Sequence, residues 1–295
     1  MGRDAVETAG GAHIALVLEG GGFRGLFTSG VLDVLMERGV WGFSSVWGVS
    51  AGALIGANYV SRQPGRCCRI NLAYRDDRRY MSLFQLATGG NIMSTTFLYD
   101  DIQNRLDPFD ATTFRNSATS MYAVVSDVVF GTPDYVVIDS LPEKIDYLRA
   151  SATMPIVSRI VQVDGRRLLD GGTTDSVPAR KALDSGARRA VVVLTRERGY
   201  QKPQLNASQA AIARRNYADY PAYLDALLTR PRRYNEQREQ LRELERQGAI
   251  FVICPPHPVE VSDVEHDGSK LLDLYVEGRQ AAEESLAALD RFMRD

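Results

Sequence analysis

Short apolar runs alternate with amphipathic stretches along much of the chain. Five consecutive apolar residues at 14–18 predict a strand that is buried on both faces of a parallel sheet. In 26–37 the apolar residues form one broad face and Gly39 follows, which predicts a helix and its end. The runs at 190–194 and 249–254 predict further buried strands. Because strands alternate with helices, the pattern predicts an α/β fold, a three-layer α/β/α sandwich with a mainly parallel central sheet.

Two other segments follow different patterns. Asp164-Gly165 is a tight-turn pair between 160–163 and 166–169, so these residues predict a hairpin. In 231–246, arginines and glutamates recur three or four residues apart, which is typical of a solvated helix. We divide the chain into a flexible N-terminal tail (1–12), an α/β domain (13–198), and a mostly helical extension with one strand (199–295) that we expect to pack on the same domain.

Ser50 is the first candidate for chemistry. It lies at the centre of Gly48-Val49-Ser50-Ala51-Gly52, between an apolar run and a helical stretch of small residues. A strand, a sharp turn and a helix around G-x-S-x-G form a nucleophile elbow, in which a strained backbone exposes the serine hydroxyl. The alternative is a serine that only caps the helix.

A glycine-rich loop precedes the first predicted helix. Gly20, Gly21 and Gly22 leave backbone N–H groups free where the helix dipole favours negative charge, which suits a phosphate or the oxyanion of acyl transfer. The spacing up to Gly25 also matches a dinucleotide fingerprint, but the next strand ends without the carboxylate that would hold a ribose. The oxyanion interpretation is better supported. We expect the guanidinium of Arg24 to anchor this loop.

Asp170 is the candidate base for Ser50. It ends the return strand of the predicted hairpin, just before a glycine pair, although a turn aspartate that bonds its own backbone would look the same. Of the three histidines, His13 begins the first strand, at the wrong end of a parallel sheet, and His266 lies in a polar segment. His257 follows a predicted strand, and a Ser50–Asp170–His257 triad would have the chain order of an α/β-hydrolase. Its proline-rich setting argues against this triad, which stays an alternative.

Taken in order, these motifs resemble the signatures of patatin-like phospholipases, in particular the bacterial single-domain branch. The resemblance spans roughly residues 13 to 198. It rests on four segments: Glu19-Gly20-Gly21-Gly22-Phe23-Arg24-Gly25, Gly48-Val49-Ser50-Ala51-Gly52, Ala150-Ser151-Ala152-Thr153-Met154-Pro155 and Asp170-Gly171-Gly172. Each motif is weak alone, whereas the ordered set is specific.

The resemblance implies a serine hydrolase with a Ser–Asp dyad and no cofactor or calcium. Ser50 would be the nucleophile, Asp170 the base, and the N–H groups of Gly20, Gly21 and Gly22 the oxyanion hole. The implied partner is a lipid or acyl-ester substrate, with room for transient contact with a membrane surface. Two other classes stay open: a nucleotide-binding module that uses the glycine loop, and a lipid-binding protein with an idle dyad.

The composition of the chain is typical of an enzyme that does not bind nucleic acid. The chain has 295 residues, is 44% hydrophobic and has a net charge of −2, so it can bury a sizeable core and has no global basic field. Three cysteines, two of them adjacent, favour reduced thiols in a cytoplasm and show no metal-ligand spacing. We find neither a signal peptide nor an apolar run long enough to span a membrane, and expect a cytoplasmic protein with the option of peripheral contact with the inner face of the membrane.

One segment suggests a lid. Residues 75–86 combine a charge cluster with tyrosine, methionine, leucine and phenylalanine, followed by a glycine pair. A mobile interfacial lid is conceivable, but apolar stripes at helical spacing usually face a core, so we favour a core-facing helix here.

Overall fold

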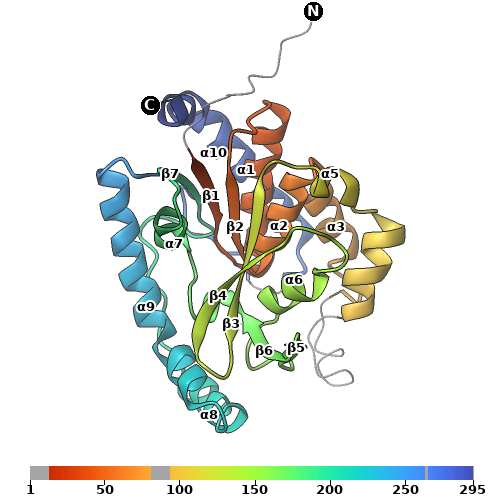
Figure 1. Cartoon of the computed structure of the whole chain (residues 1–295), viewed down its shortest axis with the longest axis vertical. Helices are drawn as coiled ribbons and strands as arrows, with labels where there is room; N and C mark the ends of the chain where they lie inside the picture. The colour runs from red at the N-terminus through yellow and green to blue at the C-terminus, as the bar shows by residue number, and fades with distance from the viewer. Residues whose placement is uncertain (1–12, 81–93, 263–264, 295) are drawn as a thin grey trace, which may run out of the picture.

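The computed structural model describes residues 13–80, 94–262 and 265–294, and within them eight strands form one mixed sheet with helices on both faces (Figure 1). The parallel strands stand in the order β3-β2-β1-β7-β8. This arrangement confirms the α/β fold predicted from the sequence. The bounds of these strands are Ile14–Leu18 (β1), Ser45–Val49 (β2), Ser120–Asp127 (β3), Arg189–Val193 (β7) and Ile250–Ile253 (β8).

Strand β3 joins the parallel and antiparallel parts of the sheet. β4 (Thr132–Val137) pairs antiparallel with 122–127 of β3 and occupies one edge of it. The other edge is shared: β2 pairs with 120–124, and β6 (Arg166–Asp170) pairs antiparallel with 125–127. β2 and β6 therefore lie in line on one edge of β3, and their carboxyl ends meet. β5 (Val161–Val163) pairs with β6, which confirms the predicted hairpin.

Helices cover the two faces of the sheet unequally. The larger core lies under α1 (Gly25–Glu37), α2 (Ala51–Val60), α3 (Arg66–Tyr74) and α10 (Gly268–Arg294). On the other face, α7 (Ala179–Asp184) and α9 (Pro221–Arg246) pack against β1 and β7 (Figure 1). The remaining helical segments are η1 (Gly22–Arg24), η2 (Phe97–Leu106), α5 (Ala111–Arg115), α6 (Ile145–Ser151), η3 (Gly171–Thr173) and α8 (Ala207–Asn216).

Helix α10 crosses α1 at backbone contact distance. A Cβ atom built on Gly30 of α1 would lie 2.1 Å from the carbonyl oxygen of Tyr275, and one built on Gly278 of α10 would lie 2.1 Å from that of Phe27. Only glycine fits at either position, because real Cβ atoms do not approach a carbonyl oxygen so closely. The crossing joins the first helix of the sheet domain to the last helix of the chain.

Helix α9 differs from its prediction in length and in burial. It begins at Pro221, and Pro231 lies inside it, although an internal proline removes a hydrogen bond. Tyr223, Leu227, Pro231 and Tyr234 recur on one buried face, so packing outweighs the cost of the proline. The helix is solvated on its opposite face only.

The segment 75–86, for which we favoured a core-facing helix over a lid, lies outside the described residues from 81 onward. Helix α3 ends at Tyr74, and 75–80 form turns, so the described part of the segment is not helical. The tyrosine at its end, Tyr80, is buried in the core.

Candidate active site

Ser50 sits in the turn between β2 and α2. Its φ of 55° and ψ of −125° place a non-glycine residue at positive φ, a conformation that costs energy and persists only when the surroundings enforce it. The turn packs closely against the end of β1, and Gly52 makes this contact possible, since a Cβ at Gly52 would lie 2.6 Å from the carbonyl oxygen of Leu18. The predicted strand, sharp turn and helix are thus present, and Ser50 is 8% exposed.

Asp170 ends β6 and faces the end of β2. Val49 pairs with Val124 of β3, and Asp170 pairs with Val125, the next residue on the same edge. The sheet therefore brings Ser50 and Asp170 together from segments far apart in the sequence. Asp170 is 6% exposed, and its Oδ1 accepts a hydrogen bond of 2.8 Å from the N–H of Gly172. It is a turn aspartate as well as a neighbour of the serine.

The glycine loop packs directly against Ser50. A Cβ on Gly20 would lie 2.8 Å from the Cβ of Ser50, and one on Gly21 would lie 2.8 Å from Oγ1 of Thr195. Gly22 has a φ of 54° and lines the same pocket as Ser50. Within the described residues, the N–H groups of Gly21 and Gly22 donate no hydrogen bond to a backbone carbonyl. These donors therefore stay available to a ligand next to the serine.

The end of α6 and the turn that follows it hold both members of the predicted dyad. The hydroxyl of Ser151, which is fully buried, accepts a hydrogen bond of 2.9 Å from the N–H of Ser50. The carbonyl of Thr153 accepts one of 2.9 Å from the N–H of Asp170. Sequence reasoning identified this segment only through its resemblance to a family. A buried serine between two alanines carries no local signal that its hydroxyl supports another residue.

Helix α9 supports the glycine loop from the other side of the sheet. The hydroxyl of Tyr234 donates a hydrogen bond of 2.7 Å to Oε1 of Glu19, and Oε2 of Glu19 accepts one of 2.7 Å from the N–H of Thr195. Glu19 is 4% exposed and directly precedes the loop, while Oγ1 of Thr195 donates to the carbonyl of Gly20 at 3.0 Å. A chain of hydrogen bonds thus connects α9 to the loop.

The same helix contacts the turn after Asp170. Arg233 donates hydrogen bonds to the carbonyls of Thr173 at 2.7 Å and Thr174 at 3.2 Å. The hydroxyls of Tyr223 and Thr173 are 3.2 Å apart. Sequence analysis missed all of these α9 residues, because their partners are far away along the chain and the charge pattern of the helix indicates only a solvated face.

An apolar pocket of about 160 Å³ opens beside Ser50. One face of α2 forms a wall of it, from Ala51 through Leu54 and Ile55 to Asn58, and Gly22 contributes at the Ser50 end. Most of its lining is carbon. With a nucleophile candidate and free N–H donors at one end, this pocket suits an extended hydrocarbon chain attached to a carbonyl. We refer to it below as the apolar pocket.

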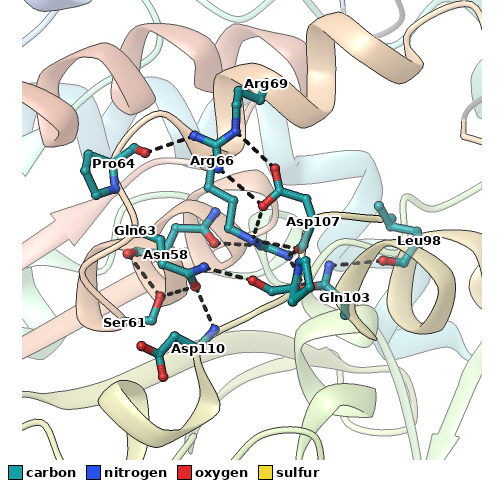
Figure 2. A network of polar contacts seen from close by, with 11 residues as sticks. Asn58, Ser61, Gln63, Pro64, Arg66, Arg69, Leu98, Gln103, Asp107 and Asp110 are labelled. Carbon is teal, nitrogen blue, oxygen red and sulfur yellow. Dashed lines mark hydrogen bonds and ion pairs between the residues drawn. The ribbon is translucent and has the colours of Figure 1, made fainter. Parts of the chain in front are cut away.

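Figure 2 shows a network of polar contacts around Arg66, and three of its members, Asn58, Arg66 and Gln103, also line the apolar pocket. Arg66 is 2% exposed and donates to Oδ1 of Asn58 at 2.8 Å, Oε1 of Gln103 at 2.9 Å and the carbonyl of Asp107 at 3.1 Å. Burial lowers the pKa of Arg66, and the charge of Asp107, whose Oδ1 lies 3.3 Å from Nε, opposes that shift. Because its donors form hydrogen bonds within the protein, this guanidinium has a structural role and is not expected to bind an anionic ligand.

The three histidines lie away from Ser50. His13 precedes β1, at the opposite end of the parallel strands. His257 is exposed after β8, an edge strand that β7 and β1 separate from β2. The ring of exposed His266 lies 3.5 Å from Asp76. Arg24 ends the 3₁₀ turn of the glycine loop, and its expected role as loop anchor stays a prediction.

Comparisons with known proteins agree with the motifs. A family model described as patatin-like phospholipase matches residues 16–183, more than half of the 295-residue chain. A model of a domain of unknown function, DUF6363, matches residues 220–294, which contain α9 and α10. Among the described residues, no helix is both long and apolar enough to cross a membrane.

Two curated proteins are similar over part of the chain. The uncharacterized protein YjjU of Escherichia coli is 33% identical over 189 residues, which cover 62% of this chain and 52% of that protein. Lysophospholipase NTE1 of Mycosarcoma maydis is 26% identical over 185 residues, or 62% of this chain and 10% of that protein. The matches thus span about half and about a tenth of the lengths of these relatives.

Two solved structures are similar in outline. VipD from Legionella pneumophila matches with a TM-score of 0.48 and 14% identity, over 94% of this chain and 67% of that one. The type III effector protein ExoU matches with a TM-score of 0.39 and 13% identity, over 94% and 53%. Because the matching family model includes the elbow, the glycine loop and the hairpin that ends in Asp170, the chain belongs to the patatin-like phospholipase family.

Proposed function

We propose that this protein is a serine acyl hydrolase that cleaves fatty-acyl esters through an acyl-enzyme on Ser50. The observation that carries the proposal is the shared edge of β3, on which β2 and β6 end against each other next to the glycine loop. The apolar pocket beside Ser50 supports an acyl chain as the bound group. Membership of a phospholipase family supports lipid ester hydrolysis as the reaction class.

In the proposed mechanism, Asp170 takes the proton of Ser50 while Oγ attacks the ester carbonyl. The carboxylate of Asp170 is 6% exposed, so little bulk water competes with the Ser50 hydroxyl for it. The N–H groups of Gly21 and Gly22 stabilise the oxyanion, and such a donor contributes about 3 kcal/mol to the transition state. Asp170 then protonates the departing alcohol, which leaves an ester on Ser50.

Water completes the cycle in the second half. Asp170 takes a proton from a water molecule that attacks the acyl-enzyme, the same N–H groups hold the second oxyanion, and Ser50 departs with the proton as the fatty acid leaves. Each step uses the same base and the same donors, so no histidine is required. Alkoxide leaving groups depart more readily than amines, which favours esters over peptides as substrates.

The decisive test is labelling with a fluorophosphonate probe, followed by mass spectrometry, beside hydrolysis of a short-chain nitrophenyl ester. We expect the adduct on Ser50, and a loss of at least about 10³-fold in turnover for Ser50→Ala. Ser61→Ala is the matched control, since Ser61 is also buried and lies at the other end of α2. An adduct on another residue, or an unlabelled wild type, would contradict the proposal and favour an idle dyad.

Variants of Asp170 and His257 separate the dyad from the alternative triad. Asp170→Asn should be nearly as inactive as Ser50→Ala, and the double variant little worse, because the two residues act as a unit. His257→Ala should keep most of its activity. If His257→Ala were as inactive as Ser50→Ala, a conventional triad would replace the dyad.

A further inference from the structure

Helix α9 places a second arginine, Arg230, beside the turn that follows Asp170. A Cβ atom built on Gly172 would lie 3.1 Å from Nη2 of Arg230 and also 3.1 Å from Oδ1 of Asp170. The two charged groups are therefore no further apart than twice that distance, and glycine at position 172 places no side chain between them. Nothing in the proposed mechanism uses Arg230.

The contacts of Arg230 differ from those of the other arginines of the helix. Arg232, Arg242 and Arg246 form ion pairs with glutamates three or four residues away, and Arg233 donates to carbonyl oxygens. Arg230 forms no ion pair among the described residues, and its Nε is buried there without a hydrogen-bond partner. A buried donor without a partner destabilises a protein, so stability does not explain the position of this guanidinium.

The other charged side chains near Asp170 have partners of their own. The elements packed on β6 and η3, and the turn after η3, carry these titratable or charged side chains: Asp127, Arg149, Tyr99, Tyr223, Arg233 and Asp175. Asp127 and Arg149 each form an ion pair with another residue, at 3.6 Å and 2.8 Å. Asp175 accepts hydrogen bonds from two side chains, at 2.8 Å and 2.7 Å.

The two tyrosines near Asp170 carry no charge at neutral pH. Burial raises the pKa of Tyr223, the charge of Asp170 adds to that shift, and the charge of Arg230 opposes it. The hydroxyl of Tyr223 is therefore within electrostatic reach of both groups. Burial also raises the pKa of Tyr99. This leaves Arg230, among the described residues, as a cation beside Asp170 that has no ion-pair partner of its own.

The charge of Arg230 bears on what Asp170 must do as a base. A carboxyl group can take up a proton only from its ionised form. Loss of surrounding water disfavours that form, whereas a positive charge within about 4–6 Å favours it. Asp170 is 6% exposed, so a neighbouring cation acts on it where water is scarce.

We propose that Arg230 keeps Asp170 ionised for proton transfer and so sets the lower pH limit of acyl transfer. Arg230 acts through the charge of the aspartate, which makes it a positioning residue. This inference rests on the proposed function, and it gives α9 an electrostatic effect on the base in addition to its hydrogen bonds to the site.

The first test is the dependence of kcat/KM on pH for hydrolysis of a short-chain nitrophenyl ester. Without the positive charge, Asp170 would take up a proton at a higher pH, so Arg230→Met should move the acid limb of the profile upward by about one pH unit. Its loss of kcat/KM should be about tenfold on that limb and should shrink toward the plateau. Arg230→Lys keeps the charge and should leave the limb near its wild-type position. Arg230→Gln, with a smaller neutral side chain, should behave as Arg230→Met does.

Arg232→Met is the matched control, because Arg232 carries the same charge on the same helix, with a side chain that is 61% exposed and pairs with Glu236. Its acid limb should stay in place. A fall in kcat/KM by the same factor at every pH in Arg230→Met would indicate a purely structural role and overturn the inference. An equal shift of the limb in Arg232→Met would overturn it too.

Carbon-13 NMR of the aspartate carboxyl carbons measures protonation without turnover, with Asp170→Asn to identify the signal of Asp170. We expect the midpoint of its titration to rise by about one pH unit in Arg230→Met and to stay in place in Arg232→Met. An unchanged midpoint in Arg230→Met would contradict the inference. A raised midpoint, in a protein that neither hydrolyses esters nor reacts with a fluorophosphonate, would overturn only the proposed function.

Discussion

At the scale of single residues, the glycine loop has no space for a side chain at Gly20 or at Gly21. Gly20 faces Ser50 and Gly21 faces Thr195, so each glycine is required by a close approach and not by backbone flexibility alone. The crowding is what brings two N–H donors beside the serine. In the proposed oxyanion hole the donors are backbone N–H groups, and the close contacts of the loop allow only glycine at Gly20 and Gly21.

Gly21→Ala should therefore lower kcat by on the order of 10²-fold with little change in KM, because the lost stabilisation exists only in the transition state. The added methyl would lie 2.8 Å from Oγ1 of Thr195, so either the loop or the Thr195 side chain, which bonds the carbonyl of Gly20, must shift. Steady-state kinetics and a melting curve measure both effects. Gly199→Ala is the control, since a Cβ there meets nothing within 4 Å. Full kcat in a normally folded Gly21→Ala would mean that the loop is only structural.

At the scale of elements, α9 stabilises the site from the opposite face of the sheet. It contacts the start of the glycine loop through Glu19 and the turn after Asp170 through Thr173. One rigid helix thus fixes the two segments that must approach Ser50 from different strands. The helix belongs to the part of the chain that matches a domain of unknown function, and we propose that this part helps to position the site.

Tyr234→Phe tests this role, because it removes the hydrogen bond to Glu19 and keeps the ring. We expect a fall in kcat of about tenfold, with KM nearly unchanged, since a misplaced donor weakens the transition state more than the ground state. Tyr275→Phe is a close control: the hydroxyl of Tyr275 also donates to a buried carboxylate, Asp33 of α1, at 2.8 Å, away from the site. Both variants should melt earlier. If Tyr275→Phe lowered kcat as much as Tyr234→Phe does, α9 would stabilise the fold in general and would not position the site.

At the scale of the whole molecule, the last helix packs on the first. The crossing of α10 and α1 at Gly278 and Gly30 depends on backbone contact, so Gly278→Ala should reduce the free energy of unfolding by about 1–3 kcal/mol. Urea denaturation should show one transition with an unchanged m-value, because the two ends share a core. Two separate transitions would show instead that α10 unfolds on its own. Gly199→Ala again serves as control.

Much of this molecule could be predicted from local sequence. Buried parallel strands, the elbow at Ser50 and the hairpin before Asp170 each follow from residues that are close together in the chain. The end-to-end meeting of β2 and β6 could not be predicted, because it depends on their sharing one edge of β3. The support from Ser151 and Tyr234 was also missed, since a hydroxyl reveals its partner only once the chain has folded.

The contacts of α9 set an order of events during synthesis. Ribosomes make the chain from its amino end, so Ser50 and Asp170 exist well before Arg233 and Tyr234 do. A growing chain therefore contains the reacting groups of the proposed mechanism without the helix that holds Glu19 and Thr173 in place. Under the proposed mechanism, the protein can therefore carry out acyl transfer only after α9 has been synthesised and has packed against the sheet.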